Sequence, residues 1–433
     1  MPDLSSEGAR ASARADGLAS EDVRRHNLAL VARHIAATGP VARSEIAAAT
    51  GLSRGSVTAL TAMLVDAAVV TEAEPEPSAR RGRRLQKLSI FAPHIALVAV
   101  QIDADHVSVV TADLAGTELA RSVASHGRPF RDPGSILDLA ATALTRALAD
   151  AARAGRRAVD VTIVMFAPVA GDPPIVVADT DLEWGPVDVV AELRQRCAAL
   201  RSDLPVHLVA DVVVAAAAEF AEQPGVTDAL YIKSDSGIGG AALSHGMLLR
   251  GAHGMAGAFG HIAIAPDGEP CVCGQRGCLV TVAGPDALLK RAGMAEVAAR
   301  HGLTEAVDLF VARVTSAEPM AVAAWREGAR WVGHALHVLT LALDPALIVV
   351  GGFWASLAGD IDEAFQARRP VIEGEPLFPV AVVAGSLGTE AALRGALREA
   401  CTRLLADPLA LALAGRGEGG DGGRHARGNS REG

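Results

Sequence analysis

The feature that most constrains this chain is a cluster of three cysteines and a histidine near its middle. Cys271, Cys273 and Cys278 fall within eight residues, and His261 precedes them by ten. The alternative is that these are buried free cysteines beside an unrelated histidine. The whole chain has only five cysteines, so this alternative would require three of the five to lie within eight residues by chance. Three thiolates and an imidazole form a closed tetrahedral ligand set that zinc accepts, with no position left for water. The cluster therefore predicts a structural zinc ion.

Length and composition indicate a soluble protein of two or three domains. The chain has 433 residues, more than one ordinary hydrophobic core accommodates, and half of them are apolar. Its first residues are polar and lack the apolar segment of a secretion signal. Long apolar stretches are interrupted by charged residues such as Asp211 and Asp344, so none is expected to span a membrane. We therefore expect a cytoplasmic protein.

The charge distribution leaves room for one small nucleic-acid-binding module. A net charge of −10 argues against a chain that coats nucleic acid along its length. Nucleic-acid binding by a small module, however, depends on the local electrostatic potential of that module. One short segment carries five cationic residues and no acid: Arg80, Arg81, Arg83, Arg84 and Lys87. Taken alone, this run is equally typical of a solvated linker.

The hydrophobic pattern changes along the chain and predicts four segments. Residues 1–20 and 413–433 have no clear periodicity and are expected to be disordered tails. From residue 21 to about Thr71 the apolar residues follow a helical period, and the basic run and an apolar strand extend this domain to residue 92. From residue 93 to 405, short β-rich runs alternate with Ala-rich helices, which predicts a mixed α/β domain.

Residues 21–92 have the plan of a winged helix-turn-helix. One helix is predicted from Glu21 to Gly39-Pro40, a second at Ser44–Thr50, and a third after the N-cap Ser53. Their buried stripes are Leu28, Val31 and Ile35 in the first helix and Val57, Leu60 and Leu64 in the third. The basic run and a strand at Leu85–Phe91 complete the wing.

The α/β domain contains a weak internal repeat. Two strands, Ile95–Ile102 and Val107–Ala112, flank the turn Asp103–His106. About 130 residues later, Ala229–Lys233 and Ala241–Leu243 flank Ser234–Gly240, which indicates a duplicated domain. Further predicted elements are helices at Ile136–Ala154, Val187–Leu200 and Val322–Leu343 and a buried strand at Leu347–Val350.

Gly257-Ala-Phe-Gly-His261, followed by Cys271-Val-Cys-Gly-Gln-Arg-Gly-Cys278, resembles the signature of the ROK family of sugar kinases and repressors. The similarity continues through Ser236–Gly240, Leu347–Gly352 and Gly385–Leu397 and covers roughly residues 20–405. The resemblance implies an α/β fold: an N-terminal winged helix-turn-helix followed by a two-lobed actin-like (ribonuclease H-like) domain. In kinase members the cleft between the lobes binds a hexose and ATP.

Departures from the family pattern favour a regulator without catalytic residues. The kinase turn Asp-x-Gly-Gly-Thr is replaced by Asp103–His106, which lacks the glycines that approach phosphate and places a carboxylate near the phosphate position. The resemblance implies Asp211 and His261 as ligand-binding residues, although Asp211 fits equally well as the N-cap of the following helix. Sugar-binding groups are replaced by Ala210, Ala258, Val280 and Ala167-Pro168. Losing two carboxylates removes roughly 3–6 kcal/mol of hexose binding.

In a winged helix-turn-helix the third helix enters the major groove with its N-terminal end toward the bases. Direct base contacts are expected from Arg54, Ser56 and Thr58, and wing contacts to phosphate or the minor groove from Arg81, Arg83 and Arg84. The alternative, a three-helix protein-interaction module, leaves the basic wing unexplained.

Three functions remain open. The preferred one is a homodimeric or homotetrameric repressor that binds a DNA operator and whose cleft closure changes the spacing of its DNA-binding heads. The second is a sugar kinase with a fused DNA-binding domain. The third is a regulator that responds to a partner protein and has no small-molecule effector.

Overall fold

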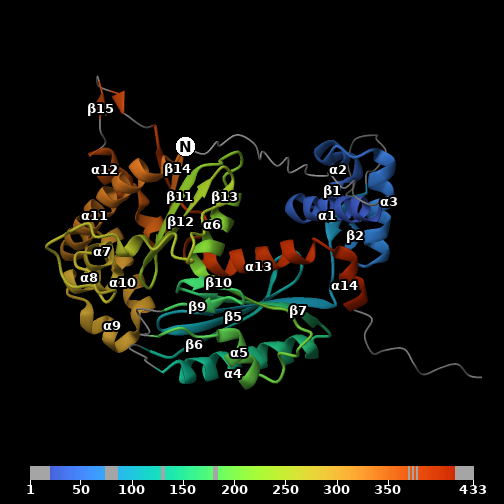
Figure 1. Ribbon diagram of the computed structural model, residues 1–433, viewed down its shortest axis with the longest axis horizontal. Helices are drawn as coiled ribbons and strands as arrows, with labels where there is room; N and C mark the ends of the chain where they lie inside the picture. The colour runs from blue at the N-terminus through green and yellow to red at the C-terminus, as the bar shows by residue number, and fades with distance from the viewer. Residues whose placement is uncertain are drawn as a thin grey trace, which may run out of the picture. The chain divides into compact units, whose positions relative to one another are not determined.

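The computed structural model describes residues 20–73, 86–127, 132–178, 184–368, 371–372, 375–376 and 379–414 (Figure 1). The chain divides into two compact units. Unit 1 comprises Met1–Phe91 with Arg403–Gly433, and unit 2 comprises Ala92–Thr402. Within the described ranges, no helix has both the length and the hydropathy needed to cross a membrane.

Unit 1 contains three helices and a small antiparallel sheet. The helices are α1 (Ser20–Thr38), α2 (Arg43–Thr50) and α3 (Arg54–Asp66). The strands β1 (Val41–Ala42), β2 (Val70–Ala73) and β3 (Lys87–Ile90) pair in the order β1-β3-β2. Three helices followed by the hairpin β2-β3 match the order of elements that the sequence predicts for residues 21–92.

The local sequence explains where α3 begins and which face it buries. The Ser53 hydroxyl oxygen accepts a hydrogen bond from the Ser56 N–H at 3.1 Å, which caps the helix. Val57 and Leu64 are completely buried, and Leu60 is 6% exposed. The predicted apolar stripe of α3 is therefore its core face, which leaves the opposite face to solvent.

Unit 1 also has elements that the sequence analysis does not predict. The helical period predicted up to Thr71 ends earlier, because Ala68 adopts a left-handed φ of 54° and Val70 already pairs with Ile90 in the sheet. Helix α14 (Pro408–Ala414) packs against α1 in the same unit, and its Leu411 is 4% exposed.

The first lobe of unit 2 is a five-stranded sheet with the order β10-β7-β4-β5-β6. Strands β4, β5 and β6 are antiparallel, whereas β4, β7 and β10 are parallel. Figure 1 shows α4 and α5 along one face of this sheet. The elements are β4 (Ile95–Ile102), β5 (His106–Ala112), β6 (Glu118–Ser125), α4 (Pro133–Arg153), β7 (Arg157–Met165), β8 (Val169–Ala170), β9 (Ile175–Val176), α5 (Val189–Arg196) and β10 (Val206–Ala210).

The second lobe repeats this topology with the order β13-β12-β11-β14-β17. Its first three strands are again antiparallel and the other two parallel, so the predicted internal repeat is confirmed. The elements are α6 (Asp211–Ala221), β11 (Ala229–Ser234), β12 (Ile238–Ser244), β13 (Met247–Leu248), η1 (Phe259–His261), α7 (Leu279–Ala283), α8 (Pro285–Arg291), α9 (Ala295–His301), α10 (Leu303–Thr315), α11 (Pro319–Leu343), β14 (Leu347–Gly352), η2 (Phe353–Leu357), α12 (Ala358–Gln366), β15 (Val371–Ile372), β16 (Glu375–Pro376), β17 (Ala381–Ala384), η3 (Gly388–Glu390) and α13 (Ala391–Leu404).

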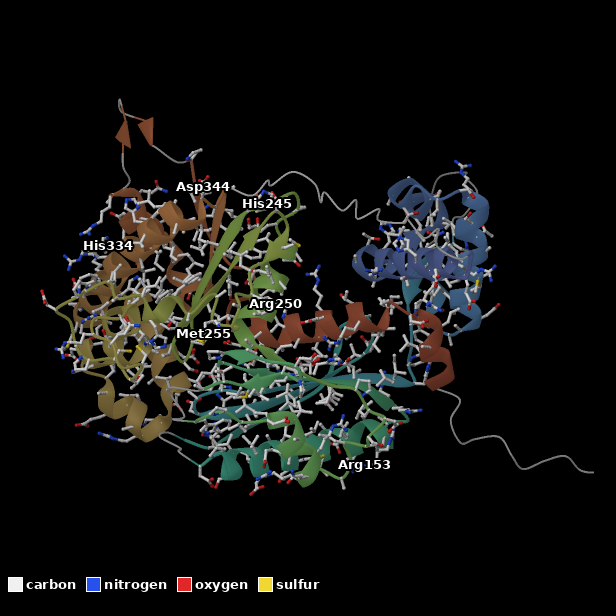
Figure 2. All side chains as sticks on the ribbon, in the orientation of Figure 1. Arg153, His245, Arg250, Met255, His334 and Asp344 are labelled. Atoms are coloured by element: carbon white, nitrogen blue, oxygen red, sulfur yellow. The ribbon has the colours of Figure 1, made fainter. Side chains whose placement is uncertain are left out.

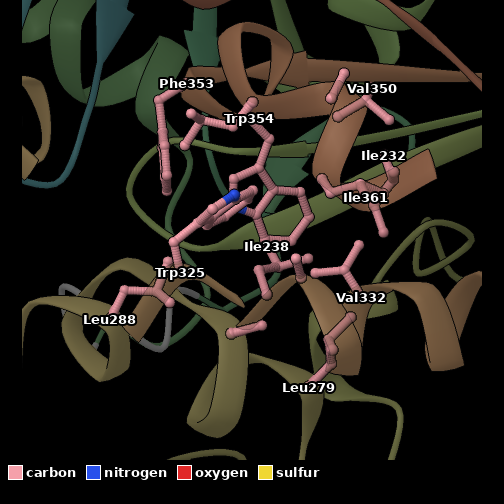
Figure 3. Close-up of a cluster of buried hydrophobic side chains, with 14 of the residues drawn as sticks. Ile232, Ile238, Leu279, Leu288, Trp325, Val332, Val350, Phe353, Trp354 and Ile361 are labelled. Carbon is pink, nitrogen blue, oxygen red and sulfur yellow. The ribbon is translucent and has the colours of Figure 1, made fainter. Parts of the chain in front are cut away.

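Two tryptophans lie in the core of the second lobe (Figure 3). Trp325 of α11 and Trp354 of η2 are 1% and 0% exposed, and they pack with side chains from the sheet such as Ile232 and Val350. Residues near the ends of β11 and β14 belong to this core, and the turn that follows β11 carries polar groups described next.

Candidate functional site

Unit 2 contains a cavity of about 1280 Å³ that both lobes line. The turn after β4 contributes Asp103, the turn after β11 contributes Asp235–Gly237, and α6 contributes Asp211. Arg250 and Met255 also line it, and Figure 2 labels both. The two copies of the repeat therefore bring their first turns to the same cavity.

A buried charge cluster forms the floor of this cavity. The Lys233 Nζ atom lies 2.7 Å from Oδ2 of Asp211 and 2.5 Å from Oδ2 of Asp235. Burial alone would lower the pKa of Lys233, but the adjacent carboxylates outweigh it and hold that pKa well above its usual value. Burial raises the pKa of Asp235 despite the contact with Lys233.

Asp211 is placed at the cavity as expected, but it does not cap α6. The N-cap is Ala210, and the Asp211 Oδ1 atom accepts a hydrogen bond from the N–H of Val212 at 2.7 Å. Its second oxygen contacts Lys233. The N-cap interpretation of Asp211 is therefore wrong, because Asp211 is the first residue of the helix and Ala210 before it is the N-cap.

Asp103 links the two lobes at the cavity. Its carboxylate accepts hydrogen bonds from Gln101 Nε2 at 3.0 Å and from the N–H of Ala104 at 2.8 Å. It also accepts a short hydrogen bond from the hydroxyl of Ser236 in the second lobe. The turn after β4 is thus hydrogen-bonded to the turn after β11.

Asp105 makes a second link and does not line the cavity, which corrects the expectation that it occupies the phosphate position. Its carboxylate accepts hydrogen bonds from the N–H of Thr304 at 3.0 Å and from its hydroxyl at 3.1 Å. Thr304 lies at the start of α10, so Asp105 compensates an unpaired helix N–H there. The turn Asp103–His106 therefore joins the lobes.

The charge states of this turn follow from its contacts. His106 Nδ1 lies 2.7 Å from Oδ1 of Asp105. Burial would raise the pKa of Asp105, but hydrogen bonds from His106 and Thr304 hold it far below its usual value. Burial would lower the pKa of His106, but Asp105, with Asp103 and Asp235 nearby, raises it. The contact with Asp105 thus favours the protonated imidazole of His106 relative to a free histidine.

The apolar replacements predicted from the sequence lie in the cavity wall. Ala167, Pro168, Ala210, Ala258 and Val280 all line it. The floor carboxylates of Asp103 and Asp211 already contact donors of the protein itself. The wall positions where the family resemblance implies sugar-binding groups are apolar.

The four predicted metal ligands come together in one place beside the cavity. The ligand atoms of His261, Cys271, Cys273 and Cys278 all lie within 4.8 Å of one another. Cys271 Sγ lies 3.5 Å from His261 Nδ1, and Cys273 Sγ lies 3.6 Å from Cys278 Sγ. Burial lowers the pKa of His261, which favours the neutral imidazole that a metal requires.

Backbone contacts hold this loop in its tight shape. The residues on either side pair as isolated bridges, Ala263 with Cys278 and Pro270 with Arg276. Gly277 has a φ of +66°, and a Cβ atom there would lie 1.5 Å from the carbonyl oxygen of Ala265. Only glycine fits, so the Gly-Cys278 pair is a requirement of the loop. A thiolate and imidazole set of this shape fits one tetrahedral ion.

The DNA-contact residues predicted in α3 are exposed. Arg54, Ser56 and Thr58 all reach solvent. The hydroxyls of Ser53 and Ser56 lie 2.9 Å apart, and Thr58 Oγ1 donates to the carbonyl of Arg54 at 2.9 Å. The wing residues Arg81, Arg83 and Arg84 lie outside the described residues, between β2 and β3.

Sequence reasoning missed Lys233, Asp235 and Ser236 as cavity residues. One signal was present, because Lys233 is a lone cation in the strand Ala229–Ser234, whose residues are all buried. A buried lysine needs a paired carboxylate, and the charged residues at the neighbouring turns are the available partners.

Comparison with known proteins finds two kinds of relative. The ROK family model matches residues 97–402. A glucokinase from Streptomyces coelicolor is 31% identical over 310 residues, covering 66% of this chain and 94% of that protein. The DNA-binding transcriptional dual regulator NagC from Escherichia coli is 24% identical over 364 residues. The match covers 81% of this chain and 84% of NagC.

Solved structures show the same division. A ROK family transcriptional regulator, a homolog of the E. coli MLC protein, has a TM-score of 0.67 at 22% identity and covers 91% of this chain and 98% of its own. A ROK family glucokinase from Streptomyces griseus in complex with glucose and AMPPNP has a TM-score of 0.58 at 26% identity. The match covers 70% of this chain and 98% of the glucokinase. These two regulators span more of this chain than these two glucokinases do.

Proposed function

This chain belongs to the ROK family, and on that premise we propose that it is a sequence-specific DNA-binding transcriptional regulator that acts as a repressor. The supporting observation is unit 1: three helices and a small antiparallel sheet outside the 97–402 match, in a chain of which a regulator structure covers 91%. The glucokinase structure covers 70%. A DNA-binding head explains why the chain carries this additional unit.

DNA recognition is assigned to α3 and the wing. The exposed N-terminal turn of α3 presents Arg54 to a guanine edge or a phosphate. The Thr58 hydroxyl donates within the helix, which leaves its methyl group for contact with thymine, while Ser56 is engaged with Ser53. Direct readout therefore rests on few groups, and much of the affinity is expected from phosphate contacts of the wing arginines.

A sugar kinase is the second candidate, favoured by glucokinase relatives at 31% identity and by the presence of Asp211 in the cavity. The contacts of Asp211 argue against it. A general base must be free to accept the proton of the acceptor hydroxyl, but Asp211 is held in an ion pair with Lys233. The first turn, moreover, is occupied in linking the lobes through Asp103 and Asp105.

For control of DNA binding, we assign the cavity as the effector site and closure of the two lobes as the signal. Repressors of this design act as homodimers or homotetramers, so closure changes the spacing of two heads on the operator. The ligand expected is a sugar derivative or another small molecule with few hydroxyls. A thermal-shift screen that finds no ligand, together with DNA binding that changes when a protein partner is added, would favour the third hypothesis.

The metal proposed for the His261, Cys271, Cys273 and Cys278 site is zinc in a structural role. Four protein ligands leave no open position for a substrate or water, so the ion would supply folding energy and no chemistry. It would hold the loop 261–278, whose residues also form part of the cavity wall. Ligand sensing and metal binding would therefore share one loop.

The direct test is selection of bound DNA from a random double-stranded library by the full chain. We expect a defined operator with two half-sites, because paired heads read paired sequences. Arg54→Ala should relax selection at one base position, with a cost of about 1–3 kcal/mol at that position. No enriched sequence with folded, zinc-loaded protein would overturn the proposed function.

A further inference from the structure

The cluster of Lys233, Asp211 and Asp235 has no part in the proposed DNA-binding function. Lys233 lies on β11 between the fully buried Ile232 and Ser234, and its side chain is 6% exposed. Its Nζ atom contacts Asp211 and Asp235 at 2.7 and 2.5 Å. A single cation is thus enclosed at the base of a large cavity.

The ammonium is a permanent part of this cluster. Removing a lysine from water is unfavourable unless opposite charges lie in direct contact. Here two carboxylates supply that contact, and the pKa of Lys233 stays well above its usual value although burial acts in the opposite direction. Lys233 is therefore charged across the range of pH in which the protein works.

The cluster contains more acceptor oxygens than donors. Asp103 faces it closely enough to raise the pKa of Asp235. Oδ1 of Asp235 is buried and has no hydrogen-bond partner within the described part of the chain. Two carboxylates thus contact one cation, and carboxylate oxygens are the ligands that Mg²⁺ and Mn²⁺ prefer.

We propose that the ammonium of Lys233 is a fixed internal cation in the position that a divalent metal ion would otherwise take between Asp211 and Asp235. Lys233 then determines the specificity of the cavity. A ligand that arrives as a metal–phosphate complex finds its cation position filled, whereas an uncharged ligand is unaffected. This inference goes beyond the proposed function and does not depend on DNA binding by unit 1.

The test is Lys233→Ala in the full chain, with Mn²⁺ as the probe and binding followed by calorimetry and electron paramagnetic resonance. We expect the wild type to bind no Mn²⁺ at millimolar concentration and the variant to bind one ion per chain. The variant should melt at a lower temperature than the wild type because its carboxylates have lost their cation. Saturating Mn²⁺ should restore much of that loss in the variant alone.

Two further variants make the result specific to this cluster. Lys290→Ala removes another lysine that lines the cavity, but its side chain is 70% exposed and its Nζ atom lies 3.6 Å from Glu269, so this variant should bind Mn²⁺ no more than the wild type does. Lys233→Ala/Asp235→Ala removes the cation and one of its ligands, so it should fold and bind no Mn²⁺. Zinc content is measured in every sample, so that exchange at the cysteine site is recognised.

Several outcomes would overturn the proposal. These are a folded Lys233→Ala protein without Mn²⁺ binding, equal Mn²⁺ binding by the wild type, and binding that persists in the double variant. If Lys233→Ala does not fold alone, refolding with Mn²⁺ but not without it supports the proposal. Failure to refold with Mn²⁺, while the double variant folds, contradicts it.

Discussion

Two aspartates in the turn after β4 make this turn a link between the two lobes. Asp103 and Asp105 lie two residues apart, but one faces the cavity and the other faces α10. Each accepts hydrogen bonds from the opposite lobe, through Ser236 and Thr304. In a glycine turn, backbone N–H groups are free to bind a phosphate. Here the side chains of the turn instead contact the opposite lobe.

The imidazolium of His106 should make the stability of unit 2 depend on pH. Its pKa is raised in the folded state, so the stabilisation is fully present below about pH 6.5 and is lost as the pH rises through the folded pKa. Asp105 acts in the opposite sense, because its lowered pKa gives stabilisation that is lost only under acidic conditions. Thermal melts from pH 6 to 9 should therefore show a decline in the wild type that is weaker in His106→Gln.

The control for this experiment is His245→Gln, because the His245 side chain is 90% exposed and lies on the turn between β12 and β13. Its melting curve should follow the wild type at every pH. Parallel pH profiles for wild type and His106→Gln would show that His106 contributes no titrating stabilisation.

The metal centre gives a second prediction at the scale of a residue. The wild type should contain one zinc per chain by elemental analysis, and Cys273→Ser should lose it together with a large part of its thermal stability. Cys401→Ser is the matched control, because Cys401 lies away from the cluster and its thiol only donates to the carbonyl of Leu114 at 3.2 Å. Metal-free protein that melts at the wild-type temperature would rule out a structural ion.

At the scale of the element, the wing is expected to contact the DNA backbone. Replacing Arg83 and Arg84 with Ala should weaken binding about equally on all sequences. It should also reduce the slope of log affinity against log salt by about one for each lost phosphate contact. Binding isotherms at several salt concentrations measure both effects, and an unchanged slope would remove these arginines from the interface.

The elements with strong periodicity could be predicted from the sequence, whereas the shortest ones could not. Strands β4, β5 and β11 and helices α4 and α11 are apolar or amphipathic over many residues, and the structure confirms them close to the predicted bounds. A two-residue strand such as β1 has no period to detect. Strand β6 was missed because nearly all of its side chains are exposed, so it lacks the alternation that marks a half-buried strand.

The candidate site divides in the same way. The metal ligands are close in sequence, so their spacing alone predicts that they form one site. The contacts of Asp103 with Ser236 and of Asp105 with Thr304 join residues 133 and 199 positions apart. Such pairs depend on how two sheets face each other, and a single sequence carries no record of that.

For the whole molecule, we expect no sugar kinase activity. The base Asp211 is paired with Lys233, the first turn joins the lobes, and the cavity wall carries Ala258 and Val280 where carboxylates would hold the acceptor. Phosphoryl transfer relies on positioning and electrostatic stabilisation, and we expect these contacts and replacements to prevent both. Glucose, N-acetylglucosamine, mannose and xylose should not be phosphorylated above background, and ATP should not raise the melting temperature.

The outcome that would restore the kinase is specific. It is measurable turnover in the wild type that disappears in Asp211→Asn while the melting temperature and the zinc content are retained. Turnover that survives this substitution would indicate a contaminating kinase in the preparation.

Unit 1 is assembled from two separated parts of the chain, since α14 packs against α1 after the whole of unit 2 has intervened. On the ribosome, α1 to α3 emerge first, and α14 follows only after unit 2 has been synthesised. A product truncated within unit 2 therefore lacks the helix that packs against α1. The order of synthesis thus makes completion of unit 1 depend on prior synthesis of unit 2.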